Sequence, residues 1–307
     1  MKPKLVVILG PTAVGKSDVA IELALKVDAE IINADSQQVY RFMNVGTGKP
    51  DPKQRRQVPH HLIDIINPDQ EFNAALFREK SLECVQEIRS RGKNVVVCGG
   101  TGLYIRALTH GLFVGPGRKI EVRERLEQEL ERRGLSALFT RLKNIDPEAA
   151  RRIHPNDRQR IIRSLEVFET TGKRMSEWQA EHGFRENAFR VLKIGLNRDR
   201  ADLYTRINER CEQMVDRGLL QEVKSLLERG YGPDLNSLRS VGYRHMVLYL
   251  TGEKSWDEAL PLMKRDTRRL AKRQLTWFRA DRDILWFHPD ENRAAIVKGA
   301  SDFLLMG

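Results

Sequence analysis

The stretch that most restricts the possible folds of this chain is residues 4–22, near its amino terminus. Leu5 to Leu9 form an unbroken apolar run rich in β-branched side chains, which predicts a strand buried on both faces. The next eight residues fit the phosphate-loop pattern G-x-x-x-x-G-K-[ST], and helical periodicity follows at Val19 and Leu23. Strand, glycine-rich loop and helix in this order predict a P-loop core of the α/β class.

The loop itself predicts a site for a phosphate or diphosphate. Its glycines allow successive backbone N–H groups to converge on one anion, and the following helix directs its positive end toward the same point. Lys16 supplies a mobile cation, and Ser17 supplies a hydroxyl that can bind Mg²⁺. The predicted diphosphate-binding residues are Gly10, Pro11, Thr12, Ala13, Val14, Gly15, Lys16 and Ser17.

The composition is that of a soluble globular protein. The chain has 307 residues, 31% charged and 40% apolar, so it can bury a large core and is neither disordered nor a membrane protein. Its longest apolar runs have the length of strands, well below what a membrane-spanning helix needs. The run after Lys2 and Lys4 ends in the phosphate loop and is too short for a signal peptide, so we expect a cytoplasmic protein.

Cysteine content and net charge restrict the function less sharply. The three cysteines, Cys84, Cys98 and Cys211, lack C-x-x-C spacing, which argues against a disulfide framework and against a zinc site. The formal net charge of +11 favours a polyanionic partner. Because many basic proteins bind no nucleic acid, composition alone leaves RNA or DNA binding open.

Two polar residues follow predicted strands and should approach the phosphate loop. Asp35 closes the run 30–35, and Thr101 lies between glycines after the strand at 94–98. In open α/β sheets, ligands collect at the carboxyl ends of the strands, which places both side chains near the loop. Asp35 can then be a Mg²⁺ ligand, a helix N-cap or a general base. Thr101 can donate to a ligand or belong to a plain strand-to-helix turn.

Further elements complete the pattern of an α/β domain. Strands are predicted at 59–66, 189–196 and 283–287, and helices at 72–91, around 204–214 and at 267–279. His60 and His61 are adjacent rather than at metal-binding spacing, so they are interpreted as structural.

A helical segment interrupts this α/β pattern. Sheet-like patterning stops near residues 112–117 and returns at 189, which predicts a core of residues 1–115 with 189–307 and an all-helical insertion of residues 116–188. Within the insertion, Ile161, Leu165 and Phe168 share one helical face, and Arg160 and Arg163 share another. A solvated basic face is the ordinary interpretation of such a pattern.

Together, the motifs resemble one family, the tRNA dimethylallyltransferases, also called tRNA isopentenyltransferases. The resemblance rests on Gly-Pro-Thr-Ala-Val-Gly-Lys-Ser at 10–17, Asp-Ser-Gln-Gln-Val-Tyr at 35–40, Val-Gly-Thr-Gly-Lys-Pro at 45–50, Gly-Gly-Thr-Gly-Leu-Tyr at 99–104, His-Pro-Asn-Asp at 154–157, Gln-Arg-Ile-Ile-Arg at 159–163, Ser-Val-Gly-Tyr-Arg at 240–244 and Ala-Lys-Arg-Gln-Leu-Thr-Trp at 271–277. These segments span nearly the whole chain in the family's order. Ser17 stands where threonine is commoner, and Gly48 where alanine is common. The zinc finger of many eukaryotic relatives is missing, so we expect the bacterial type.

The resemblance implies transfer of a dimethylallyl group from dimethylallyl diphosphate to N6 of the adenosine just 3′ of a tRNA anticodon, with release of diphosphate. It implies catalytic roles for four residues, with Asp35 as the general base, Thr101 in contact with the reacting groups, and Arg210 and Lys16 on the leaving diphosphate. The residues implied to contact tRNA are Asp35, Ser36, Gln37, Gln38, Thr101, Arg123, Gln159, Arg160, Ile161, Ile162 and Arg163. The expected cofactor is Mg²⁺, and the expected partners are tRNA and dimethylallyl diphosphate. We expect no membrane, no obligate protein partner and a monomer.

Two other functions are compatible with a phosphate loop. A small-nucleotide kinase would bind ATP in the loop and would use the arginines of 159–163 as a lid. A non-catalytic RNA-binding protein would use the loop as a nucleotide switch and would bind tRNA without forming a covalent product. Transfer of the γ-phosphate of ATP would favour the first alternative, and RNA binding without product the second.

Overall fold

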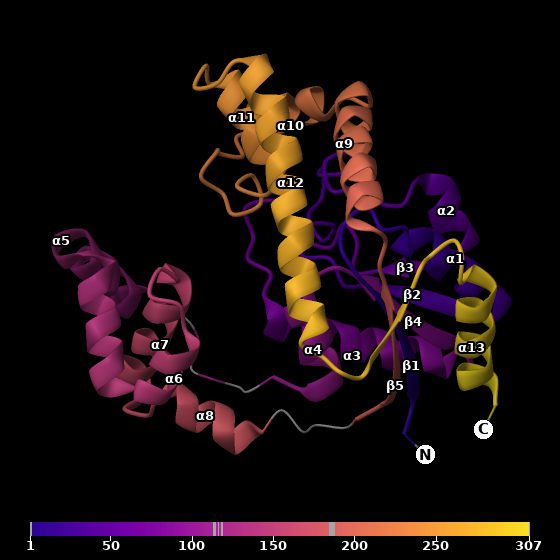
Figure 1. Cartoon of the computed structure of the whole chain (residues 1–307), viewed down its shortest axis with the longest axis horizontal. Helices are drawn as coiled ribbons and strands as arrows, with labels where there is room; N and C mark the ends of the chain where they lie inside the picture. The colour runs from indigo at the N-terminus through magenta and orange to yellow at the C-terminus, as the bar shows by residue number, and fades with distance from the viewer. Residues whose placement is uncertain (1, 113–114, 116, 118, 184–187, 307) are drawn as a thin grey trace. The chain divides into compact units, whose positions relative to one another are not determined.

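The computed structural model describes the chain apart from residues 1, 113–114, 116, 118, 184–187 and 307 (Figure 1). The chain divides into two compact units, one within Met1–Thr109 and Asn187–Gly307 and the other within His110–Glu186. The sequence-based boundaries were 115–116 and 188–189, and residue 116 lies outside the described set. Each unit has its own buried core and is described separately.

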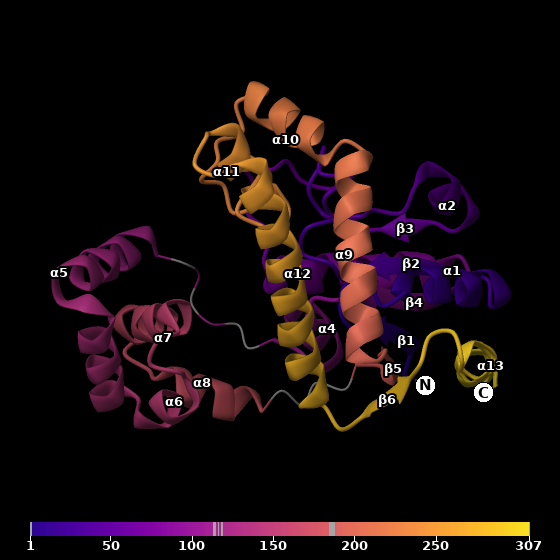
Figure 2. The same cartoon turned by 45° about the horizontal axis from the view of Figure 1, so that its top comes forward.

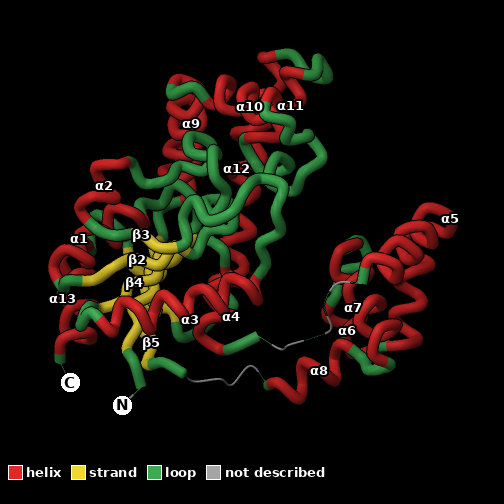
Figure 3. Tube along the Cα trace, turned by 180° about the vertical axis from the view of Figure 1, so that it is seen from behind, coloured by secondary structure: helices red, strands yellow, loops and turns green. Residues whose placement is uncertain are grey.

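The larger unit is built on a six-stranded sheet whose strand pairs are all parallel. The strands are β1 (Lys4–Leu9), β2 (Ala29–Asn33), β3 (His60–His61), β4 (Asn94–Gly99), β5 (Arg190–Leu196) and β6 (Ile284–Phe287), in the order β3-β2-β4-β1-β5-β6. The central position of β1 explains its unbroken apolar sequence, because both of its faces are covered (Figure 3). The predicted α/β core with a mainly parallel sheet is therefore confirmed.

Helices cover both faces of this sheet (Figures 1 and 3). On one face lie α1 (Lys16–Lys26) and α13 (Arg293–Leu305), and on the other lie α3 (Ala74–Ser90) and α4 (Gly102–His110). Val6 and Ile8 of β1 share one core with Val19 and Leu23 of α1, as the helical spacing of the latter two predicts. This core fixes the strand and the helix that flank the phosphate loop.

Four more helices of the larger unit follow β5. They are α9 (Arg200–Asp216), α10 (Leu219–Glu228), α11 (Tyr243–Leu250) and α12 (Trp256–Arg279), while the short α2 (Pro52–Gln57) lies beside β3. The long helices α9 and α12 run side by side (Figures 1 and 2). Their length brings side chains from the second half of the sequence to the loop near the amino terminus.

The described secondary structure of the smaller unit consists of helices joined by short turns. It contains α5 (Ile120–Ile145), α6 (Pro147–Arg152), α7 (Arg158–Thr171) and α8 (Met175–His182), and Gly134, with φ of 78°, interrupts α5 with a kink. Leu126 and Leu138 of α5 pack against Ile161 and Leu165 of α7, and all four side chains are fully buried. The predicted apolar face of α7 is therefore the core of this unit.

Two elements differ from the sequence-based expectation. The strand predicted at 59–66 contains only β3, because Leu62 and Asp64 adopt left-handed φ of 61° and 58° that a strand cannot accommodate. The Asp64 carboxylate instead accepts Lys49 Nζ at 2.6 Å and Arg55 Nη1 at 2.8 Å. The helix predicted at 267–279 begins earlier, at Trp256, where Ser255 and Glu258 form a capping box.

Among the residues that the structure describes, no helix combines the length and the apolar character that crossing a membrane requires. No group of three or more His, Cys, Asp or Glu side chains is arranged there to hold a metal ion. The two adjacent histidines make contacts within the protein: His61 Nε2 lies 2.6 Å from Glu30 Oε2, and His60 Nδ1 lies 2.7 Å from Val58 O.

Candidate active site

The predicted phosphate loop connects β1 to α1 in a conformation that depends on its glycines. Gly10 and Gly15 have φ of 145° and 103°, and Ala13 between them has φ of 64°. Gly10 also has no room for a side chain, because an added Cβ would lie 2.6 Å from the Leu196 carbonyl oxygen. Within the described chain, the N–H groups of residues 13–15 have no hydrogen-bond partner. The loop therefore presents free donors at the amino-terminal end of α1.

Lys16 begins α1, and its side chain turns back onto the loop. Its Nζ donates a hydrogen bond of 2.7 Å to the Pro11 carbonyl oxygen. Burial lowers the pKa of Lys16 to about 8, although the charge of Asp35 acts in the opposite direction, and Arg210 acts in the same direction as burial. Lys16, Asp35 and Arg210 are thus close enough to influence one another electrostatically.

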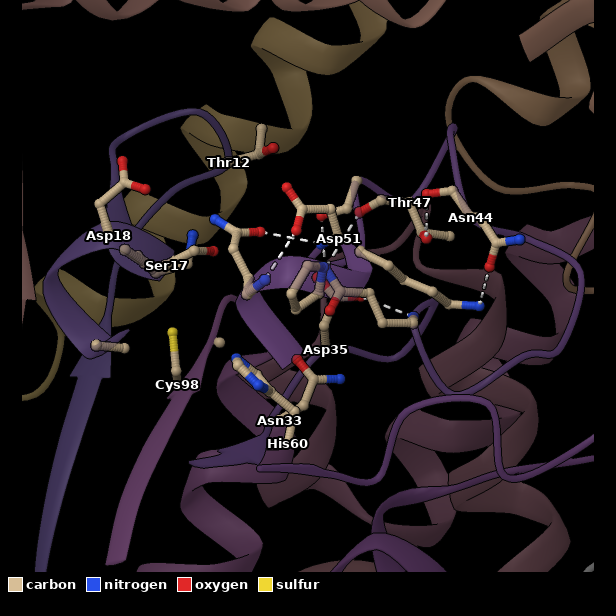
Figure 4. A pocket seen from close by; sticks show the side chains of 18 of the residues that line it. Thr12, Ser17, Asp18, Asn33, Asp35, Asn44, Thr47, Asp51, His60 and Cys98 are labelled. Carbon is tan, nitrogen blue, oxygen red and sulfur yellow. Dashed lines mark hydrogen bonds between the residues drawn. The ribbon is translucent and has the colours of Figure 1, made fainter. Parts of the chain in front are cut away.

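A cavity of about 1150 Å³ opens beside the loop (Figure 4). It is lined by the loop, the strand ends, α9 and α12, including Thr12, Ala13, Gly15, Lys16, Ser17, Asp35, Gln38, Arg206, Arg210 and Gln274. Ligand pockets for small molecules commonly measure about 300–1,000 Å³. The cavity therefore has room for a second reactant beside a diphosphate.

Asp35 follows the carboxyl end of β2 and lines this cavity (Figure 4). Its Oδ1 accepts the N–H of Gln37 at 2.8 Å and that of Gln38 at 3.4 Å, which closes the turn after the strand. Its Oδ2 has no hydrogen-bond partner among the residues that the structure describes. One oxygen thus fixes the carboxylate in place, and the other is available to a ligand.

Thr101 is held beside the Asp35 segment. Its Oγ1 accepts the N–H of Ser36 at 3.0 Å, and its own N–H donates to the Ala34 carbonyl oxygen at 3.1 Å. Gly99 permits this close approach, because an added Cβ would clash with the Ala34 backbone. Since the hydroxyl oxygen accepts a hydrogen bond, its proton remains free to be donated to a ligand.

Arg210 of α9 brings a guanidinium to the same cavity. Burial lowers its pKa, and the Asp35 charge partly opposes this shift. Gly48 packs directly against the guanidinium, since an added Cβ would clash with Arg210 Nη2. The loop that carries Gly48 is held by Glu222, whose carboxylate accepts the N–H groups of Asn44 and Val45, each at 2.8 Å. The motif at 45–50 therefore shapes the surroundings of Arg210.

Gln274 of α12 is a site residue to which the sequence analysis assigned no role. Its Oε1 accepts the N–H of Thr12 at 2.9 Å, and its Nε2 donates to the Gly100 carbonyl oxygen at 3.0 Å. This side chain connects the phosphate loop to the loop of Thr101. The Thr12 N–H is therefore engaged, and Pro11 has no N–H. The free backbone donors of the loop begin at Ala13. The motif at 271–277 was the available signal.

The side chains of Gln37 and Gln38 differ in whether they have hydrogen-bond partners within the protein. Gln38 Nε2 donates to Thr47 O at 3.2 Å and to Gly48 O at 3.3 Å, so it supports the loop beside Arg210. Gln37 Oε1 is buried without a hydrogen-bond partner. A buried acceptor without a partner is costly, but Gln37 does not line the cavity, so its predicted contact with RNA stays a prediction.

In the helical unit, the residues predicted to contact RNA fall into two groups. Gln159 and Arg160 are exposed on α7, whereas Ile161 and Ile162 are fully buried in the core. The side chains of Ile161 and Ile162 therefore have no surface to offer an RNA, and they position their neighbours instead. The basic face is also less open than the sequence implies, because Glu166 of the same helix pairs with arginine.

Glu166 is fully buried and is surrounded by cationic side chains. Arg163 Nη1 lies 3.0 Å and Arg123 Nη1 3.8 Å from its Oε2. Arg160 Nε lies 3.4 Å from the half-buried Asp157, and Arg160 itself is 59% exposed, so this ion pair costs little to separate. Arg160 is therefore the member of the predicted set that is most available to a phosphate.

The fold and this site define a class of protein, an α/β core in which a P-loop with free backbone donors lies next to a carboxylate. A model of the IPP transferase family matches residues 38–281. Two curated relatives, each called tRNA dimethylallyltransferase 2, come from Geotalea uraniireducens and Syntrophus aciditrophicus. They are 50% and 51% identical over 98% and 99% of this chain and 97% of their own length.

Solved structures agree. The tRNA isopentenylpyrophosphate transferase of Bacillus halodurans is 40% identical, with a TM-score of 0.74 over 99% of this chain and 97% of that one. A eukaryotic dimethylallyltransferase acting on tRNA is 29% identical, with a TM-score of 0.81 over 98% of this chain and 79% of that one. The chain belongs to the family of tRNA dimethylallyltransferases and is an enzyme. The kinase and switch alternatives find no support among these relatives.

Proposed function

We propose that this enzyme transfers a dimethylallyl group from dimethylallyl diphosphate to N6 of the adenosine 3′-adjacent to a tRNA anticodon, releasing diphosphate. The observation that carries this proposal is that Asp35 and the phosphate loop line one cavity, with Arg210 on its wall. An anion site and a carboxylate that line one cavity suit an alkylation that releases an anion and removes a proton. The sequence relatives at about half identity carry names for this reaction.

Asp35 is proposed to act as the general base. An adenine amine is a weak nucleophile, and it becomes stronger as a positioned carboxylate accepts its proton while the C–N bond forms. The N–H groups of Gln37 and Gln38 orient Oδ1, and Oδ2 faces no partner of the described chain. Thr101 supports the Asp35 segment through the Ser36 N–H but does not itself line the cavity, so its contact with the reacting groups stays a prediction.

The phosphate loop, Lys16 and Arg210 are proposed to stabilise the leaving group. As the allylic C–O bond breaks, negative charge accumulates on the diphosphate. The free N–H groups of the loop, Lys16 and Arg210 face that charge and are already in place before the reaction. Burial makes these interactions stronger than they would be in water.

We also propose that Mg²⁺ accompanies the diphosphate. Ser17 exposes its hydroxyl to the cavity, and Mg²⁺ prefers oxygen ligands, several of which are usually phosphates and water. The described residues offer no cluster of acidic side chains that could bind the ion alone, so the diphosphate would have to supply most of its ligands. When bound, the ion would neutralise charge on the leaving group, with Ser17 as its protein ligand.

The RNA substrate must present its adenosine in an unpaired loop. Base edges in an A-form stem are poorly accessible, so the target has to leave the stack and enter the cavity. Arg123, Gln159, Arg160 and Arg163 of the helical unit are proposed to bind the phosphates of the anticodon stem-loop. Action in the cytoplasm as a monomer remains a prediction.

The direct test of the proposal is a product assay. The enzyme is incubated with unmodified bulk tRNA, dimethylallyl diphosphate and Mg²⁺, and the nucleosides are analysed by mass spectrometry. We expect an adenosine heavier by one dimethylallyl group, and no such product when dimethylallyl diphosphate is replaced by ATP. An unmodified nucleoside profile with intact tRNA binding would contradict the proposed reaction.

The lowered pKa of Lys16 predicts a decline of activity at alkaline pH. Because burial lowers this pKa to about 8, the ammonium is charged below pH 8 and is progressively lost above it in the free enzyme. We expect kcat/KM for dimethylallyl diphosphate to fall as the pH rises through about 8. Since arginine keeps its charge, Lys16→Arg should move this decline to higher pH even if its overall rate is lower. The same alkaline limb in both proteins would exclude Lys16 as its origin.

A second prediction concerns the exposed arginine of α7. Arg160→Ala is expected to weaken tRNA binding and to flatten the plot of log affinity against log salt by about one unit, because one phosphate contact is lost. The double variant Arg160→Ala with Arg163→Ala should reduce the slope further. It also removes Arg163 as the ion-pair partner of the buried Glu166. Arg133→Ala on α5 is the control, and filter binding at several salt concentrations is the measurement. A slope equal to that of the unchanged protein would place the RNA elsewhere.

A further inference from the structure

The phosphate loop is held from outside the cavity by an arginine to which the proposed chemistry assigns no role. Arg198 follows β5, and its side chain is only 5% exposed. Its Nε donates to the Val14 carbonyl oxygen at 3.1 Å. Its other nitrogens pair with Asp202 of α9 at 3.1 Å and with Asp290, between β6 and α13, at 2.7 Å. Arg198 does not line the cavity, so a direct contact with substrate is not its role.

The contact with Val14 determines where the next backbone donor points. The peptide bonds of the described chain are trans, so the C=O and N–H of one peptide unit point in opposite directions. Because the Val14 carbonyl is directed at Arg198, the N–H of Gly15 in the same peptide unit is directed away from it. Gly15 lines the cavity, and this N–H is one of the free donors of the loop.

The Gly15 end of the loop needs such an external support because no side chain of the loop holds it. Gly15 is the N-cap of α1 with φ of 103°, and no side chain caps the helix there. Glycine also gains more freedom than other residues when it is not held. Arg198 and the neighbouring Pro289, which would lie 3.8 Å from a Cβ added at Gly15, enclose the peptide on its outer side.

The charge balance around Arg198 indicates that it acts through geometry. One guanidinium is paired with two carboxylates, so the cluster as a whole does not attract an anion. Burial opposes ionisation of Asp290, but the hydrogen bond and charge of Arg198 outweigh it and hold the pKa of Asp290 below its usual value. Both carboxylates therefore orient the guanidinium and cancel its long-range field.

We propose that Arg198 is a positioning residue that orients the Val14–Gly15 peptide for diphosphate binding, with Asp202 and Asp290 holding the guanidinium in register. The inference rests on the proposed function, because it assumes that the loop binds the diphosphate of the substrate. It also links the carboxy-terminal β6–α13 segment to the loop near the amino terminus.

A second arginine, Arg206, donates to the Ala13 carbonyl oxygen at 3.3 Å. Since Arg206 also lines the cavity, its replacement would not separate positioning from direct binding.

The test measures binding of inorganic diphosphate with Mg²⁺ to the full chain by calorimetry, and binding of tRNA separately. Arg198→Ala is expected to weaken diphosphate binding about 10- to 100-fold, the range for one hydrogen bond to a charged group, and to leave tRNA affinity unchanged. Arg198→Lys should recover only part of the loss, because an ammonium cannot reproduce three oriented contacts. Asp290→Asn, which keeps Arg198 but loosens it, should give a smaller loss. Arg293→Ala, which removes a half-buried arginine that pairs with Glu22, is the control.

Steady-state kinetics separate positioning from a merely structural role. Positioning predicts a higher KM for dimethylallyl diphosphate with the KM for tRNA unchanged, whereas instability alone would reduce the amount of active enzyme and leave both KM values. If folded Arg198→Ala bound diphosphate as tightly as the unchanged protein, the inference would be overturned. If the alanine variant did not fold, unchanged diphosphate binding by Arg198→Lys and Asp290→Asn would overturn it. Complete recovery by lysine would overturn it in favour of a charge effect. Failure of the unchanged protein to bind diphosphate would contradict the proposed function itself.

Discussion

Asp35→Asn is expected to lower the turnover of dimethylallyl transfer by about 10²–10⁴-fold, the range typical of a lost general base. Asparagine has almost the same shape, and its Oδ1 can still accept the N–H groups of Gln37 and Gln38, so the turn after β2 should persist. What disappears is the ability of the side chain to accept a proton from the adenine amine. The measurement is the single-turnover rate with saturating tRNA and dimethylallyl diphosphate.

Asp51→Asn is the matched control for this variant. Asp51 lines the same cavity, and its carboxylate caps α2 by accepting the N–H of Gln54 at 2.8 Å. Asparagine is an equally good N-cap, so this variant removes one negative charge from the cavity without removing the proposed base. We expect its turnover to stay near that of the unchanged protein. Equal losses in both variants would mean that the charge of the cavity matters and that Asp35 has no special role.

Lys16→Ala should produce the second large effect, a loss of about 10²–10³-fold in the rate of the chemical step. The ammonium is buried, contacts the loop through Pro11 O, and faces the position where diphosphate charge develops. Because this charge grows as the allylic bond breaks, removing Lys16 should reduce kcat more than it raises the KM for tRNA. Rapid-quench single-turnover kinetics would measure the step directly.

Lys26→Ala provides the comparison on the same helix. Lys26 lies exposed in the last turn of α1, so its loss removes an equal charge far along the helix from the loop. Its turnover should match that of the unchanged protein. A single-turnover rate for Lys16→Ala equal to that of the Lys26→Ala control would remove Lys16 from the proposed mechanism.

Much of the α/β core follows from local patterns in the sequence. β1, the glycine-rich loop and α1 were predictable because a central parallel strand must be apolar on both faces and because a helix repeats its apolar residues on one face. Asp35 and Thr101 could be assigned to the site for a similar reason, since parallel strands direct their carboxyl ends to one edge of the sheet. The strand predicted at 59–66 was too long, because the left-handed backbone of a residue such as Leu62 cannot be recognised from hydrophobic periodicity.

The interpretation of α7 shows where local patterns stop being sufficient. Spacing identified Ile161 and Leu165 as a buried face and placed Arg160 and Arg163 together on another. It could not show that Glu166 turns inward and pairs with Arg163, because a carboxylate on a helix is usually solvated. The family motif at 159–163 therefore combines exposed side chains with side chains that only hold the helix in place.

The sequence by itself determined the class of this protein, because the phosphate loop, the strands around it and each of the ordered motifs are short contiguous segments. Only the tertiary structure decided how the loop is held and what surrounds it. Arg198, Arg210 and Gln274 lie about two hundred residues or more after the loop, on β5–α9 and α12, and no local period indicates that they reach it. Such contacts arise from the packing of whole elements against one sheet, which a pattern of nearby residues does not record.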